Sequence, residues 1–132
     1  MTLTFTVPGL PRSKERARHG KYGNVYTPTP TKNYEEEIWI CAMKAGARQL
    51  CFGDRPLWLG LKVYMAPPKK PKYAFPTRRP DFDNLQKVVM DGLKHTFKDD
   101  AQVVGVLPGN GKFYGEPRIE IELTDNNNER KP

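Results

Sequence analysis

Apolar and polar residues alternate in three separate segments, and this two-residue period constrains the fold more than any other feature of the sequence. Residues 2–7 alternate threonines with Leu3, Phe5 and Val7, and residues 57–65 and 118–123 repeat the pattern with other residues. Successive side chains of a strand point to opposite faces, so each segment predicts a strand with one buried face. A sheet built from them needs other elements to cover that face.

Two segments with a helical period can supply the cover. The first runs from about residue 32 to residue 50, and the second from about Asn84 to Phe97, with apolar residues on one face. The valine-rich residues 103–107 predict a fourth strand, and Pro108-Gly109-Asn110-Gly111 is a strong turn signal. The order predicts an α+β fold, a mixed sheet of about four strands with two helices packed on it.

The length of 132 residues suits one domain with one hydrophobic core. We assign residues 1–123 to this single domain. Residues 124–132 carry no apolar side chain, which predicts a flexible C-terminal tail.

The chain is basic, with 22 Lys plus Arg against 15 Asp plus Glu and a formal net charge of +7. Such an excess favours a polyanionic partner, with nucleic acid ahead of a membrane surface. Composition alone is weak evidence, but the basic residues are concentrated in two segments. These are Arg12, Lys14, Arg16, Arg18 and Lys21 in the first, and Lys69, Lys70, Lys72, Arg78 and Arg79 in the second.

Several classes of protein are excluded or disfavoured. Cys41 and Cys51 are the only cysteines, without the Cys and His partners that a structural zinc site requires. No apolar run approaches the roughly 18 residues that span a bilayer. The N-terminus has the pattern of a strand and not of a signal peptide. We therefore expect a cytoplasmic protein without a disulfide bond.

The first candidate site is the pair Asp81 and Asp83, which follows Pro80. In extended backbone, residues two apart face the same way, and two such carboxylates are favourable mainly when a cation lies between them. Oxygen ligands without soft atoms nearby favour Mg²⁺ or Mn²⁺ over zinc. The alternative is helix capping, because Asp83 with Gln86 has the spacing of a capping box. Capping leaves Asp81 unexplained, and Asp83 can serve both roles through different oxygens.

A second acidic pair, Asp99 and Asp100, follows the second predicted helix. A polar turn into the next strand is the plain explanation. A strand that begins near Gln102 could, however, return this turn to the sheet edge where that helix began. Three or four carboxylates would then converge beside two basic loops. Metal ligands within a cationic surround are what a metal-dependent phosphodiesterase needs.

Two segments carry a resemblance to a known family. They are Arg78-Arg79-Pro80-Asp81-Phe82-Asp83-Asn84-Leu85-Gln86-Lys87 and Asp99-Asp100-Ala101-Gln102-Val103-Val104, and the N-terminal half agrees with them. Over about residues 2–123 the chain resembles the RusA-type Holliday-junction resolvases. The resemblance implies a homodimer that nicks four-way junction DNA symmetrically with Mg²⁺, for which Mn²⁺ substitutes. It implies that the catalytic metal ligands are Asp81, Asp83 and Asp100, with Lys87 as a catalytic support.

The expected activity is hydrolysis of DNA phosphodiesters that leaves 5′-phosphate ends, in recombination and repair. The expected DNA contacts are Arg78 and Arg79 beside the site, and Lys14, Arg16 and Arg18 on the junction arms. Two alternatives stay open, a related metal nuclease acting on flaps or RNA and a non-catalytic branched-DNA-binding protein. Carboxylates within a phosphate-binding surface weaken affinity, which argues against a pure binder. Whether Asp91 or Asp99 assists is left open.

Overall fold

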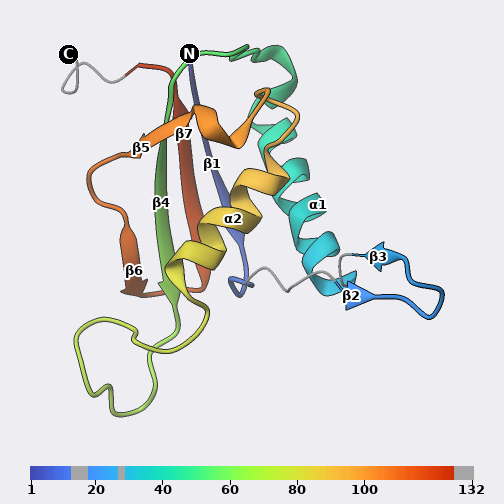
Figure 1. The fold of residues 1–132 in the computed structure, drawn as a ribbon. Helices are drawn as coiled ribbons and strands as arrows, with labels where there is room; N and C mark the ends of the chain where they lie inside the picture. Colours follow the sequence, from blue (N-terminus) through green and yellow to red (C-terminus); the bar gives the residue numbers. More distant parts are fainter. Residues whose placement is uncertain (13–17, 27–28, 127–132) are drawn as a thin grey trace.

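The computed structural model describes residues 1–12, 18–26 and 29–126. Two α-helices, seven strands and two short 3₁₀ turns make up this part of the chain (Figure 1). In chain order they are β1 (Thr2–Pro8), β2 (Arg18–His19), β3 (Val25–Tyr26), α1 (Thr29–Lys44), η1 (Ala47–Gln49), β4 (Leu57–Met65), α2 (Phe82–Gly92), η2 (Asp100–Gln102), β5 (Val103–Val106), β6 (Gly111–Tyr114) and β7 (Arg118–Thr124).

Five strands form one mixed sheet. Its order is β1-β7-β4-β5, and β6 pairs with β4 on a second stretch of that strand. Strand β7 is antiparallel to both β1 and β4, whereas β5 and β6 are parallel to β4. The predicted α+β class, with two helices on a mixed sheet, is confirmed. The count of four strands misses β6, which follows the predicted turn, and the short β2–β3 hairpin lies outside this sheet.

One face of the sheet is the core. The register aligns Leu3 with Leu123 and Leu123 with Leu59, so the apolar rows of three strands coincide. All three side chains are buried, while the alternate residues of these strands, except Thr124, are exposed or half-buried. Both helices cover this face, and they approach each other closely at Gly92. A Cβ atom there would lie 2.8 Å from the Ile38 Cγ2 atom.

Both predicted helices end earlier than expected. Helix α1 ends at Lys44, and η1 replaces its last predicted turn. Helix α2 begins at Phe82 and ends at Gly92, although Leu93 and Phe97 beyond it are still buried. These two side chains are buried in the core although their backbone is not helical. The apolar period of the sequence therefore continues beyond the end of α2.

The unit β4-α2-β5 is a parallel crossover. Helix α2 starts after the end of β4 and runs back along the sheet, and β5 starts beside the beginning of β4 at the pair Leu57–Val103 (Figure 1). Parallel strands need such a return connection. The two ends of α2 therefore lie at opposite ends of β4.

The C-terminal prediction was wrong for residues 124–126. Thr124 is a buried residue of β7, and its hydroxyl accepts a hydrogen bond from the backbone N–H of Asn126 at 3.1 Å. The carboxylate of Asp125 pairs with the α-ammonium of Met1 at 2.8 Å and with Arg55 at 2.9 Å. Residues 127–132 lie outside the described residues.

Two further features of the described residues concern the cysteines and the helices. Cys41 and Cys51 are both free thiols. None of the helices in the described ranges combines the length and the apolar character that crossing a membrane requires.

Candidate active site

The segment before α2 is a proline-rich basic loop, residues 66–80, that leaves the end of β4 (Figure 1). The Arg78 guanidinium donates a hydrogen bond to the carbonyl of Ala66 at 2.6 Å, which ties the two ends of the loop together. Lys112 of β6 donates to the carbonyl of Arg78, also at 2.6 Å. Phe75 packs beside Phe113, with ring centroids 6.0 Å apart. These contacts fix the backbone that leads into α2.

Asp81 and Asp83 stand at the N-terminus of α2, and both are exposed. Asp81 is the N-cap residue, with extended backbone, but its side chain accepts no cap hydrogen bond. Asp83 lies in the first turn of the helix, so the predictions of extended backbone and of a capping role for Asp83 were wrong. The helix dipole favours carboxylates at this end. Both acids thus lie where the helix dipole favours negative charge, and their carboxylate oxygens form no capping hydrogen bonds.

Lys87 is exposed on α2, four residues after Asp83. Residues at this spacing are neighbours on a helix surface. Among the described residues, Lys87 forms no ion pair within 4.0 Å, with Asp83 or with Asp91. Its ammonium group is therefore available to a ligand at the N-terminal end of the helix. Arg79 is also exposed, just before Pro80.

The second acidic pair lies in η2, where the two aspartates have different environments. The Asp99 carboxylate accepts a hydrogen bond from the backbone N–H of Ala101 at 2.9 Å and caps the turn. Gln102 completes a capping box by accepting from the N–H of Asp99 at 2.7 Å. Asp100 is exposed and takes no part in this cap. Capping therefore accounts for Asp99 and leaves Asp100 unexplained.

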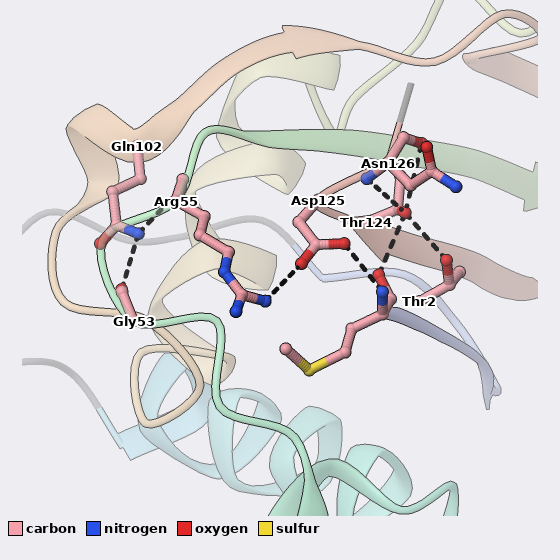
Figure 2. Close-up of polar contacts among 8 residues, drawn as sticks. Thr2, Gly53, Arg55, Gln102, Thr124, Asp125 and Asn126 are labelled. Carbon is pink, nitrogen blue, oxygen red and sulfur yellow. Dashed lines mark hydrogen bonds and ion pairs between the residues drawn. The ribbon is translucent and has the colours of Figure 1, made fainter. Parts of the chain in front are cut away.

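Gln102 also attaches η2 to the segment before β4. Its Nε2 group donates to the carbonyls of Gly53 at 2.8 Å and Arg55 at 3.0 Å, as Figure 2 shows. Arg55 in turn pairs with Asp125 (Figure 2). Asp125 also pairs with the α-ammonium of Met1. The hydrogen bond from the N-terminal ammonium, with that from Arg55, holds the pKa of the Asp125 carboxyl below its usual range. This network fixes Asp100 relative to the start of β4.

The predicted convergence of the two acidic pairs within one chain was wrong. Asp81 follows a loop fastened at the end of β4, whereas Asp100 belongs to a turn fastened before its beginning. In residues 1–12, 18–26 and 29–126, no three His, Cys, Asp or Glu side chains gather closely enough to hold a metal ion. The reason is the parallel crossover: α2 begins near the end of β4, whereas β5 and the turn before it begin beside the start of β4.

The predicted contacts of the N-terminal basic segment fall largely on undescribed residues. Lys14 and Arg16 lie outside the described ranges, as does the side chain of Arg18. Gln102 was not predicted to be a functional residue, although Asp99 and Gln102 have the capping-box spacing that would have revealed its role.

The acids at the start of α2 fit a hard divalent cation. Mg²⁺ commonly takes one or two protein carboxylates and fills its remaining positions with water and substrate phosphates. Asp81 and Asp83 supply two such groups, exposed and next to the basic loop. Asp100 of the same chain does not join them.

Two comparisons with known proteins bear on this site. A protein of Bacillus subtilis (strain 168) named "Uncharacterized protein YqaN" is 30% identical over 138 aligned positions, which cover 93% of this chain and 96% of that protein. The family model described as "Endodeoxyribonuclease RusA" matches residues 8–124, a range that contains both acidic pairs and Lys87. The chain therefore belongs to the RusA family of endodeoxyribonucleases.

Proposed function

We propose that this protein is a divalent-metal-dependent endonuclease that resolves four-way DNA junctions by symmetric nicking, acting as a homodimer in DNA recombination and repair in the cytoplasm. The observation that carries the proposal is a pair of exposed carboxylates at the start of α2. They are free of capping hydrogen bonds and directly follow the basic loop, whose ends are joined by the hydrogen bond from Arg78 to Ala66. Membership of an endodeoxyribonuclease family supports hydrolysis over binding alone.

The proposed metal is Mg²⁺, with Mn²⁺ as a substitute, because the donors are carboxylate oxygens without nearby thiolate or imidazole ligands. A bound divalent cation supplies activation of water and neutralisation of phosphate charge. Asp81 and Asp83 hold it at the start of α2. Within the proposed homodimer, we assign Asp100 of the second copy to the same metal site as the third catalytic carboxylate, because Asp100 of the same chain lies at the other end of β4.

Three cationic side chains have different roles toward the DNA phosphates. Lys87, one helical turn from Asp83, stabilises negative charge that grows on the scissile phosphate in the transition state. Arg79 and Arg78 hold flanking phosphates, although Arg78 also closes the loop through Ala66. Water attacks the phosphorus and the P–O3′ bond breaks, which leaves a 5′-phosphate and a 3′-hydroxyl.

Substitution of each acid by its amide tests this assignment. We expect Asp81→Asn, Asp83→Asn and Asp100→Asn each to abolish nicking of a labelled four-way junction, because each loses an anionic ligand. Junction affinity should persist or increase, since one negative charge leaves a phosphate-binding surface. Asp54→Asn, an exposed aspartate outside both acidic pairs, is the matched control and should cut like the wild type. Near wild-type rates in the three variants would falsify the ligand assignment.

A further inference from the structure

Three planar side chains form a row on the sheet face opposite the helices. Tyr64 alternates with the buried Val63 and Met65 of β4, so its side chain lies on the face away from the core. Phe113 of β6 stands beside Tyr64 in the strand register, with ring centroids 5.6 Å apart. The guanidinium carbon of Arg118 lies 3.7 Å from the centre of the Tyr64 ring, within cation–π distance. All three side chains are half-buried, so each keeps part of its surface open to solvent.

Phe75 of the basic loop extends this row and is far more exposed. Its ring packs against that of Phe113, with centroids 6.0 Å apart, yet 58% of the residue is exposed. The loop around it is held in place, because Arg78 donates to the carbonyl of Ala66 and its own carbonyl accepts from Lys112 of β6. A large ring that is exposed to water gains free energy when a partner covers it. Phe75 is therefore a fixed aromatic surface that suits a planar ligand group.

The charge around Phe75 favours a polyanionic partner. Residues 66–80 contain five basic residues and no acidic one. Tyr73 of the same loop is 56% exposed, and the ammonium group of Lys72 lies 5.5 Å from its ring centre. A second copy of this chain, itself carrying a net charge of +7, does not neutralise this charge, whereas DNA phosphates do. Binding sites for single-stranded nucleic acid combine positive charge with aromatic rings on which bases stack, and some place those rings on an open sheet face.

We propose that the Phe75 ring stacks on a nucleobase whose face is exposed at the branch point of the DNA. This inference deepens the proposed function and rests on it for the branched substrate. Bases inside a linear duplex are covered on both faces by their neighbours, whereas a branch point or a single strand presents free faces. Phe75 lies six residues before Asp81, a reach of at most about 22 Å, so the stacked base belongs to the same short stretch of DNA as the phosphate at the acids. Phe75 is then a residue that determines specificity for branched DNA.

Three variants of Phe75 separate stacking from other roles. Phe75→Ala removes the ring, Phe75→Leu keeps an apolar side chain without a planar face, and Phe75→Trp keeps a planar face. In metal-free buffer, affinity for a four-way junction and for a single-stranded oligonucleotide should fall about tenfold or more in the alanine and leucine variants and persist in the tryptophan variant. Affinity for linear duplex and the salt dependence of binding should not change, because no charge is removed. Ile40→Ala, which shortens an exposed apolar side chain of α1, is the control and should bind like the wild type.

Three results would overturn the inference. The first is wild-type affinity of Phe75→Ala for the junction and the single strand. The second is a leucine variant that binds like the wild type while the alanine variant does not, since a general apolar contact, including one with a second copy of the chain, tolerates leucine. The third is wild-type protein that does not prefer the single strand or the junction to the duplex, because a stacking site requires free base faces.

Photo-cross-linking locates the base directly. Iododeoxyuridine at the branch point of the junction, irradiated in the complex, should form an adduct on the peptide that contains Phe75, identified by mass spectrometry. The adduct should be lost in Phe75→Leu, and an adduct confined to other peptides overturns the inference. Wild-type protein that cross-links through Phe75 but leaves the junction uncut in Mg²⁺ refutes the proposed nuclease activity alone. Wild-type protein that cuts the junction without this adduct refutes the stacking site alone.

Discussion

Gln102 is a positioning residue whose removal should weaken both stability and catalysis. Its side chain makes four hydrogen bonds, two accepted from the N–H groups of Lys98 and Asp99 and two donated to the carbonyls of Gly53 and Arg55. Each hydrogen bond contributes about 0.5–1.5 kcal/mol. Because three of the four are exposed to water, the lower end applies, and Gln102→Ala should reduce the free energy of unfolding by about 2 kcal/mol.

The assay is denaturant unfolding of wild type, Gln102→Ala and a matched control, Gln49→Ala. Gln49 is an exposed glutamine in η1 and makes no side-chain hydrogen bond among the described residues. The control should stay within about 0.5 kcal/mol of wild type. Equal stabilities of the two alanine variants would refute the role of Gln102.

The nicking rate of the folded variant distinguishes a positioning role of Gln102 from a purely structural one. With Gln102→Ala, η2 loses its attachment to the segment before β4, so Asp100 loses its fixed position. We expect single-turnover nicking to slow at least about tenfold at a temperature where the variant is folded. Junction affinity should stay unchanged, because no phosphate contact is removed. Gln102→Glu keeps the two accepted hydrogen bonds, but an ionised carboxylate cannot donate to the carbonyls of Gly53 and Arg55. This variant should therefore lose less stability than Gln102→Ala only where the carboxylate is protonated.

Three further predictions concern the helices and the basic segment. Lys87→Ala should slow nicking by about a hundredfold with junction affinity nearly intact, and Lys87→Arg should restore the rate in part. Lys94→Ala, an exposed control, should cut normally, and single-turnover rates at saturating Mg²⁺ decide between these outcomes. Gly92→Ala should cost about 1–3 kcal/mol of stability, because its Cβ would lie 2.8 Å from Ile38 Cγ2; unfolding at wild-type stability contradicts the helix packing. Removing three basic charges together should weaken junction binding and reduce its salt slope by about 3, and an unchanged slope would show that the segment faces away from DNA. The residues to neutralise are Lys14, Arg16 and Arg18.

The strands of the core were predictable because their side-chain period is local. The alternation in β1, β4 and β7 directly reports which residues are buried. Strand β6 was not predictable, since Gly111–Tyr114 is short, begins with glycine and is held by its pairing with β4. The end of α2 was missed because burial of Leu93 and Phe97 continues the helical period beyond the helix.

The residues of the candidate site were accessible from the sequence, but their arrangement was not. Both acidic pairs have a capping-box spacing, at Asp83–Gln86 and at Asp99–Gln102, and of these two only the second forms a box. Whether Asp100 lies near Asp81 depends on the direction of β5. That direction is set by pairing with β4, 40 or more residues away in the sequence, and no local pattern reports it.

The most direct test of the proposed function is incubation of the wild-type protein with an end-labelled synthetic four-way junction, with and without Mg²⁺. Linear duplex and flap substrates of the same sequence serve as controls. The proposal predicts paired, symmetric nicks with 5′-phosphate ends in the junction, only when Mg²⁺ is present, and little cutting of the controls. Tight binding of the junction without cleavage in Mg²⁺ or Mn²⁺, or faster cutting of flaps than of junctions, would contradict it.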